Sequence, residues 1–273
     1  ITVTDLNETP SALALSASTF AENAAGATIG TLSATDPDSG ETFTYSISGT
    51  DKDSFELSGT TLKLKDTVSA NFEADASYSI TLTATDSADN TVSKDYTISV
   101  TDVNETPSAL ALSASSFNEN AAGASVGILS ATDPDSGETF TYSISGSDKD
   151  SFELSGTTLK LKDSISADFE ADASYSITLT ATDSGSNTVS KDYTVSVTDV
   201  NETPSALALS ASTLAENAAG VTVGTLSATD PDSGETFTYS ITGTDKDSFE
   251  LDGTTLKLKD SVSADYEADA SYS

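Results

Sequence analysis

The chain has 273 residues, enough for two or three domains of ordinary size. It carries 44 acidic residues against 11 basic ones, which gives a formal net charge of −33. Such an anionic chain repels phosphate backbones and anionic lipid, so nucleic acid is excluded as a partner. Cysteine and histidine are absent, which excludes disulfides and thiol chemistry and removes the usual zinc ligands.

No membrane-spanning or targeting segment is evident in the sequence. No stretch approaches the roughly 18 apolar residues of a transmembrane helix, and no basic-then-apolar signal peptide opens the chain. Residue 1 falls within a strand-like pattern. We therefore expect a fragment of a longer protein, attached to a membrane only through an anchor outside this fragment.

An internal repeat organises the whole sequence. The segment Ala34–Glu41 returns as Ala131–Glu138 and as Ala228–Glu235; its first Asp is residue 36, 133 and 230, a period of 97 residues. A module of about this length suits a seven-stranded β-sandwich. The repeat predicts these parts: the last strand and linker of an upstream repeat (1–9), two full repeats (10–106 and 107–203), and a third repeat (204–273) that stops before its last two strands.

Short alternating patterns predict the strands of each repeat. Thr and Ser fill the outward positions, and Asp-Pro-Asp-Ser-Gly and Ser-Gly segments mark turns. Helical periodicity runs no longer than Glu22–Ala25. We therefore predict an all-β fold of tandem seven-stranded Greek-key sandwiches, immunoglobulin-like in architecture and arranged as a linear array. In chain order, the predicted strands of the first repeat lie around Leu13/Leu15, Ile29/Leu32, Phe43/Tyr45/Ile47, Phe55/Leu57, Leu62/Leu64, Tyr78/Ile80/Leu82/Ala84 and Tyr96/Ile98/Val100.

The acidic residues recur at five positions in each repeat, always at a turn or at a strand end. Two carboxylates about 4 Å apart repel by roughly 1 kcal/mol in water and about 4 kcal/mol at an effective dielectric near 20. Bringing several of them together therefore calls for a bound cation. Ca²⁺ accepts 6–8 oxygen ligands from carboxylates, amides and carbonyls, whereas zinc prefers the absent His and Cys.

Four motifs in this order resemble those of cadherin repeats. They are a Glu near the start of each repeat (Glu119), a D-x-D pair (Asp133 and Asp135), a D-R-E-like segment (Asp168–Glu170) followed by an alternating strand that ends at Asp183, and a linker similar to D-x-N-D-N-x-P (Asp102–Pro107). Each motif is weak alone, but the ordered set at a 97-residue period covers the whole chain.

The resemblance implies that calcium ions, two to three at each inter-repeat junction, are held by these positions and stiffen the joint. At the first junction it implies Glu22, Glu73, Asp102, Asn104, Glu105, Asp133, Asp135 and Asp183. At the second it implies Glu119, Asp168, Glu170, Asp199, Asn201, Glu202, Asp230 and Asp232. At the junction that joins the upstream repeat to the first full repeat it implies Asp5, Asn7, Asp36, Asp38 and Asp86.

The sequence departs from the family pattern at three positions. Asn71 stands where the other repeats have Asp168 and Asp265, which removes one formal charge from the first junction. In the linker, Glu105 replaces an Asp and Thr106 replaces an Asn. These departures affect the number of ions and their affinity.

The resemblance implies calcium-dependent cell adhesion by an extracellular protein that is secreted or anchored at the cell surface. Adhesion could be homophilic, or directed at a host, cell-surface or matrix ligand. The composition, rich in Ser, Thr and Asp with Lys in place of Arg, is similar to that of cadherin-like repeats in microbial adhesins, which suggests a bacterial origin.

Other readings of the same residues remain. The repeats could form a passive acidic stalk of a large surface protein whose binding activity lies elsewhere. Asn104-Glu-Thr106 also has the form of a glycosylation sequon. Catalysis is disfavoured because the paired carboxylates occur in triplicate and no His activates a serine. Sugar binding lacks an exposed aromatic platform.

Overall fold

The computed structural model describes residues 1–4 and 6–273. The chain divides into two compact units, each made of three segments. The first unit contains Ile1–Ala111, Leu129–Ser143 and Leu179–Lys191; the second contains Leu112–Ile128, Ile144–Thr178 and Asp192–Ser273.

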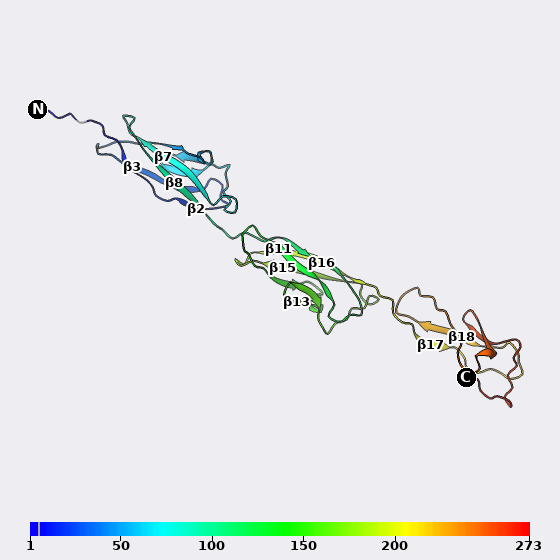
Figure 1. Cartoon of the computed structure of the whole chain (residues 1–273). Helices are drawn as coiled ribbons and strands as arrows, with labels where there is room; N and C mark the ends of the chain where they lie inside the picture. The colour runs from blue at the N-terminus through cyan, green and yellow to red at the C-terminus, as the bar shows by residue number, and fades with distance from the viewer. Residues whose placement is uncertain (5) are drawn as a thin grey trace. The chain divides into compact units, whose positions relative to one another are not determined.

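The first repeat is a sandwich of two four-stranded sheets. One sheet has the order β1-β3-β6-β5 and the other β2-β8-β7-β4; β7 and β8 lie side by side in Figure 1. All pairings are antiparallel except β2 with β8, which is parallel. The strands are β1 (Ser11–Leu15), β2 (Thr19–Ala21), β3 (Thr28–Thr35), β4 (Thr44–Ser48), β5 (Phe55–Ser58), β6 (Thr61–Leu64), β7 (Ser77–Thr85) and β8 (Thr91–Thr101), with a 3-10 helix η1 at Lys52–Ser54.

Alternation along the strands builds the core of this repeat. On β7, Ile80, Leu82 and Ala84 are buried while the Ser and Thr residues between them are more exposed. Side chains on a strand point alternately to opposite faces, so one face of the sheet is apolar and the other is hydroxylated. Leu62 from the other sheet joins the same core, with an exposed fraction of 0%. The two apolar faces therefore bury each other.

The prediction of seven strands needs one refinement. The first predicted strand corresponds to β1, and the short β2, which joins the other sheet, was not predicted. Ala12 has a φ of 50°, and the register of β1 against β3 shifts between Ser11 and Ala14. This bulge lies at the start of β1, whereas the chain crosses to the other sheet after Leu15, at residues 16–18. The Glu22–Ala25 segment, where a helical period was expected, forms turns instead, with Asn23 at φ 61°.

The second repeat has the same elements in the same order. Its sheets have the orders β13-β14-β11-β9 and β10-β16-β15-β12. The strands are β9 (Ser108–Leu112), β10 (Ser116–Asn118), β11 (Ser125–Thr132), β12 (Thr141–Ser145), β13 (Phe152–Ser155), β14 (Thr158–Leu161), β15 (Ser174–Thr182) and β16 (Thr188–Thr198), with η2 at Lys149–Ser151.

The third repeat forms only one of the two sheets. Its order is β17-β18-β20-β19, with strands β17 (Ser205–Leu209), β18 (Thr222–Thr229), β19 (Phe249–Asp252) and β20 (Thr255–Leu258), and η3 at Lys246–Ser248. The segment 238–242, the counterpart of β4, is not assigned as a strand. A strand needs a neighbour for its backbone hydrogen bonds, and the printed sequence holds no counterpart of β8 and only the first residues of β7.

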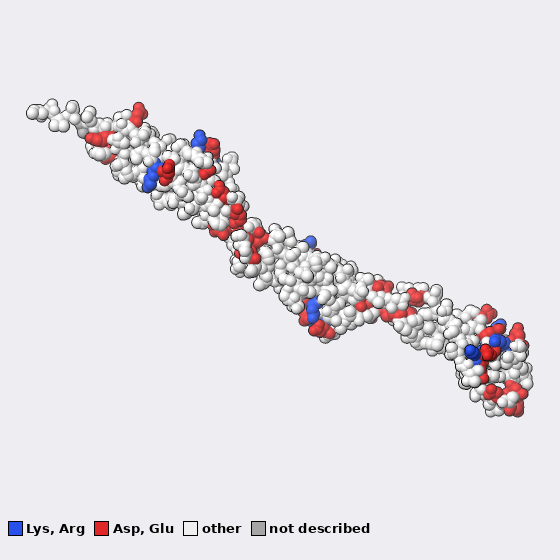
Figure 2. Space-filling model, viewed as in Figure 1, with Lys and Arg blue, Asp and Glu red and all other residues white. Residues whose placement is uncertain are grey.

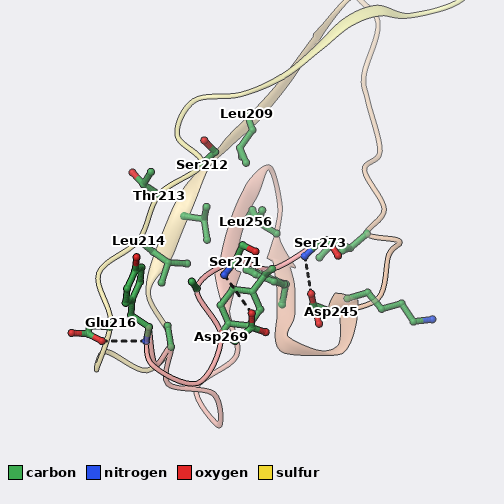
Figure 3. A pocket seen from close by; sticks show the side chains of 18 of the residues that line it. Leu209, Ser212, Thr213, Leu214, Glu216, Asp245, Leu256, Asp269, Ser271 and Ser273 are labelled. Atoms are coloured by element: carbon green, nitrogen blue, oxygen red, sulfur yellow. Dashed lines mark hydrogen bonds between the residues drawn. The ribbon is translucent and has the colours of Figure 1, made fainter.

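A cavity of about 690 Å³ lies beside this sheet (Figure 3). Core positions line it, among them Leu256 and Phe249, whose counterparts in the first repeat are the buried Leu62 and Phe55. In the first repeat, Ile80 and Ile98 from β7 and β8 share that core. The cavity is therefore the open core of a sandwich rather than a pocket shaped around a ligand.

The all-β class and the tandem sandwich repeats are confirmed, while the exact domain boundaries stay a prediction.

Candidate metal centres at the linkers

Two groups of acidic residues gather around the linkers between repeats, one in each unit. We define the first carboxylate cluster, wholly in the first unit, as the converging Glu22, Glu73, Asp102, Glu105 and Asp135 together with the predicted ligands Asn104, Asp133 and Asp183. We define the second carboxylate cluster, wholly in the second unit, as the converging Glu119, Asp168, Glu170, Glu202 and Asp232 together with the predicted ligands Asp199, Asn201 and Asp230.

Glu22 follows directly on β2 and is a buried carboxylate, with 3% of its surface exposed. Its two oxygens accept hydrogen bonds from the backbone N–H groups of Phe72 at 2.8 Å and of Val103 at 2.9 Å. Burying a charge is costly unless it is hydrogen-bonded, and these two donors meet that need. Glu22 thereby fixes the position of the loop that carries Glu73 and of the first residues of the linker.

The carboxylates of the first cluster converge. One oxygen each from Glu22, Glu73 and Asp102 lie within 4.8 Å of one another. The same spacing holds for Glu73, Glu105 and Asp135, so Glu73 belongs to both groups. The two groups together join side chains from the first repeat, the linker and the second repeat.

Three oxygens of this cluster are buried and accept no hydrogen bond from the described residues: Glu105 Oε2, Asp133 Oδ2 and Asp135 Oδ1. A buried carboxylate oxygen without a partner is costly in a folded protein. Asp133 Oδ1, by contrast, accepts from the Asp135 N–H at 3.0 Å, so the D-x-D turn holds both carboxylates in fixed positions. The unpartnered oxygens are therefore held in place and lack a positive partner.

The linker itself is held against the second repeat. The Glu105 N–H donates to Asp135 Oδ2 at 2.8 Å, and the Asn104 side-chain amide donates to Asp183 Oδ2 at 2.8 Å. Asn23 donates to Glu105 Oε1 from the first repeat. The linker thus has polar contacts with both repeats: its carboxylate with the first, and its backbone and Asn104 side chain with the second.

The surroundings of three cluster carboxylates disfavour their charged forms. Burial, followed by the nearby charge of Asp135, raises the pKa of Asp102. Burial also raises the pKa of Glu105 and of Asp133. For Asp183, hydrogen bonds from Asn104 and Asn187 outweigh the effect of burial and lower the pKa. The middle of the cluster is therefore an anionic site without its own counter-charge.

The second cluster repeats this plan. Glu119, 3% exposed, accepts from the N–H groups of Phe169 at 2.7 Å and of Val200 at 2.8 Å. Carboxylate oxygens lie within 4.8 Å of one another in two groups that share Glu170: Glu119, Asp168 and Glu170 form one group, and Glu170, Glu202 and Asp232 form the other.

The surroundings of the second cluster also disfavour the charged forms of three of its carboxylates. Burial, and then neighbouring carboxylates, raise the pKa values of Asp199 and Glu170, and burial raises that of Glu202. Glu202 Oε2 is buried without a partner among the described residues. Asp232 accepts from the Glu202 N–H at 2.8 Å and itself donates its N–H to Asp230 at 3.1 Å, while Asn201 donates its side-chain amide to the Glu202 carbonyl at 2.7 Å.

The remaining predicted residues lie at the other end of the first repeat. Asp38 accepts from the Glu8 N–H at 2.9 Å and donates its own N–H to Asp36. Asn7 and Asp86 both accept from the Asn90 side-chain amide, at 2.6 Å and 3.0 Å. Asp5, also predicted as a ligand, lies outside the described residues.

Sequence reasoning missed one group of carboxylates. Oxygens of Glu216, Asp265 and Glu267 lie within 4.8 Å of one another, and all three residues are exposed. The signal was present, because Asp265-Tyr-Glu267 repeats the pattern of Asp168–Glu170. The supporting amides of Asn23 and Asn120, which donate to Glu105 and Glu202, were also missed.

Lysine side chains are few on the visible face of the molecule, where acidic residues gather in patches (Figure 2). Lys63, Lys160 and Lys257 pair with hairpin carboxylates outside both clusters, for instance Lys160 with Glu153 at 3.0 Å and with Asp163 at 2.7 Å. These lysines do not neutralise the clusters. The donor set of carboxylates and an asparagine amide is of the kind that Ca²⁺ prefers.

Fold and clusters together define a class of protein: tandem β-sandwich repeats with an acidic, oxygen-rich site at each linker. The family model described as Cadherin domain matches residues 16–101 and 113–198. The chain belongs to the cadherin domain family, whose members form extracellular parts of cell-surface adhesion proteins.

Individual relatives agree with the family assignment. The chain is 28% identical over 295 residues to the protocadherin-like wing polarity protein stan of Drosophila melanogaster, and the match covers 98% of this chain but 8% of that protein. Protocadherin gammaB7 EC3-6, solved as a cis-dimer, is 26% identical with a TM-score of 0.64, covering 94% of this chain and 67% of that one. Mouse cadherin-23 EC22-24 has 22% identity and a TM-score of 0.68, covering 93% and 88%.

Two of these relatives come from animals, Drosophila melanogaster and the mouse, and the bacterial origin inferred from composition stays a prediction. Among the described residues, no helix has both the length and the apolar character needed to cross a bilayer.

Proposed function

We propose that this chain is an extracellular cadherin array for calcium-dependent cell adhesion, in which Ca²⁺ held by the two carboxylate clusters fixes neighbouring repeats. The observation that carries the proposal is the set of buried, unpartnered carboxylate oxygens on Glu105, Asp133, Asp135 and Glu202. Each cluster gathers these oxygens where a divalent cation would satisfy them.

Two to three ions would bind in each cluster. In the first, Glu73 would bridge an ion shared with Glu22 and Asp102 and an ion shared with Glu105 and Asp135. A third would take Asp133, Asp183 and the amide of Asn104. Ligand binding to the folded state stabilises it by about 2.7 kcal/mol when free ligand is at 100 times its Kd. The role proposed for the ions is structural, not catalytic.

The passive stalk is the second candidate, and the outer face of β7 and β8 favours it. Thr83 and Ser93 hydrogen-bond to each other at 2.8 Å, and Thr81 donates to Asp95 at 2.6 Å. These hydroxyls satisfy one another and leave no large apolar patch of the kind that marks a protein interface.

Aggregation of beads coated with this chain separates the candidates. Homophilic adhesion predicts aggregation in millimolar Ca²⁺, its reversal by chelator, and its loss in a variant with Asp135→Asn and Asp232→Asn. Lys63→Ala serves as the surface control. Dispersed beads with a chain that binds Ca²⁺ would support the stalk. A chain that takes up no Ca²⁺ would overturn the proposal.

A further inference from the structure

The turn that follows the long strand β7 and its counterpart after β15 differ at two positions, Ala88 against Gly185 and Asp89 against Ser186. Asp86-Ser-Ala88-Asp-Asn90 in the first repeat corresponds to Asp183-Ser-Gly185-Ser-Asn187 in the second. Both turns close in the same way, by a hydrogen bond from the Asp N–H to the Asn carbonyl at 3.0 Å and 3.1 Å. Their fourth residues, Asp89 and Ser186, have φ values of 68° and 76°. The two turns therefore share one backbone conformation.

Gly185 is not in the left-handed region, and Ala88 occupies the same place in the equivalent turn. The backbone therefore does not require glycine at position 185. The space around it does: a Cβ built on Gly185 would lie 2.4 Å from Cγ and Oδ1 of Asn104, and 2.7 Å from its Nδ2. The Asn104 amide therefore lies directly against Gly185. Real Cβ atoms essentially never approach other atoms as closely as a Cβ at position 185 would approach this amide.

The partners of the linker asparagine differ between the two repeats accordingly. Above Gly185, the Asn104 amide donates to Asp183 Oδ2 at 2.8 Å, and Asn187 donates to the backbone carbonyls of Asn104 and Glu105. Beside Ala88, the equivalent Asn7 donates instead to Glu41 Oε1 at 3.2 Å, and Asn90 binds its side-chain oxygen at 2.6 Å.

We infer that the residue at this turn position decides whether the linker asparagine reaches the carboxylate that ends the long strand. Gly185 leaves room for Asn104 to lie on Asp183, whereas beside Ala88 the Asn7 side chain is joined to Asp86 through Asn90, whose amide donates to both. Gly185 is thus a positioning residue. The chain contains two grades of the same oxygen site, one completed by the linker amide and one without it.

The contact between Gly185 and Asn104 is independent of the proposed calcium function, but the expected effect on calcium affinity rests on it. Replacing the residue that holds a ligand in place commonly lowers metal affinity by about 10- to 100-fold. The Asn104 amide is the flexible end of a side chain, so it would swing away from an added methyl group and leave the turn folded. Gly185→Ala is therefore expected to fold normally and to lower the affinity of one ion of the first cluster by about tenfold.

Side-chain amide resonances and calcium titrations of the full chain test the inference together. In Gly185→Ala the Asn104 amide resonances should shift in calcium-free buffer, because contact with Asp183 is lost. The affinity loss should be confined to the first cluster. In an Asn104→Ala background, Gly185→Ala should cause no further loss, since coupled residues are non-additive. Ala88→Gly is the matched control, which should bring the Asn7 amide resonances toward those of Asn104.

The outcomes separate this inference from the proposed function. Unchanged Asn104 resonances and unchanged affinity in Gly185→Ala would overturn the positioning role while calcium binding by the wild type still stands. A wild type that binds no calcium would refute the proposed function, and the resonance shift in calcium-free buffer would then still decide the role of Gly185.

Discussion

The two carboxylate clusters use the same architecture but differ in the residue at one loop position. At the start of the loop that carries the shared Glu, the first has Asn71 and the second has Asp168. Both side chains accept a hydrogen bond from the N–H three residues on, at 2.7 Å for Asn71 and 3.0 Å for Asp168. Only Asp168 adds a carboxylate oxygen to the group formed with Glu119 and Glu170. This position therefore has two separate roles: its side-chain oxygen closes the turn, and its negative charge adds to the cluster. Asn71 keeps the first role without the second.

Removing the buried Glu of a cluster should have the largest effect. In Glu119→Ala two backbone N–H groups lose their acceptor, and each buried unpaired donor costs about 1–3 kcal/mol. In calcium the variant should unfold several degrees below the wild type, measured by calorimetry. Glu216→Ala is the matched control, because Glu216 is exposed and accepts only a 3.2 Å bond from the Tyr266 N–H (Figure 3). Equal losses for the two variants would contradict this interpretation of the buried Glu.

Exchanging the charge at the variable position should have the next largest effect. Asp168→Asn should weaken calcium binding by the second cluster several-fold, and Asn71→Asp should strengthen the first by a similar factor. A unit charge about 4 Å away contributes roughly 1 kcal/mol in water. Both variants keep the side-chain oxygen that caps the turn. Isothermal titration checks the pair, and changes of the same sign in both would show that charge is not the cause.

The clusters also predict a pH dependence that calcium reverses. The pKa values of Asp102, Glu105 and Asp133 are raised in the folded state, so without calcium the folded chain binds protons more tightly than the unfolded chain. Stability should then rise as the pH falls through the raised pKa values toward the ordinary carboxylate range near 4.

Below that range, stability should fall with pH instead of rising. The pKa values of Asp86 and Asp183 are lowered in the folded state, so these carboxylates lose their stabilising contribution as they become protonated. In calcium, protons compete with the ion, and stability should instead fall from neutral pH downward. Chemical denaturation across pH with chelator and with calcium measures both curves. If stability changed with pH in the same way in chelator and in calcium, protons and calcium would not be binding to the same carboxylates.

The smallest effect is expected away from the clusters. Lys160 pairs with Glu153 and Asp163 on the surface of a hairpin. Exposed ion pairs contribute about 0–1 kcal/mol, so Lys160→Ala should lower stability by less than about 1 kcal/mol and leave calcium affinity unchanged. Denaturant unfolding checks the first point and titration the second. A calcium effect as large as that of Asp168→Asn would mean that general surface charge governs binding.

Periodicity in the sequence predicted most of the fold. Strict alternation located β7 and β8, because a strand buried on one face must place Ile80 and Leu82 on that side and hydroxyl groups on the other. Alternation could not locate the break between β1 and β2. The three-residue β2 carries too little pattern to show as a separate strand, and the sheet that it joins depends on its pairing with β8.

The membership of the clusters was predictable from motif order, but their internal contacts were not. The resemblance to cadherin motifs placed Glu73, Glu105 and Asp135 in one predicted site, and the structure brings their oxygens within 4.8 Å. No spacing rule reveals that Asn23 supports Glu105 or that Gly185 makes room for Asn104. Those contacts depend on side-chain direction across segments about 80 residues apart in the chain.

The most direct test of the central claim is the number of calcium ions bound by the purified chain, measured by equilibrium dialysis and metal analysis. Extracellular calcium modules bind with Kd values of about 10⁻⁴–10⁻³ M, so millimolar calcium is the appropriate range. The account predicts about two or more ions in each carboxylate cluster, with the number reduced in the Asp135→Asn and Asp232→Asn variant. A chain that remains free of calcium at these concentrations would contradict it.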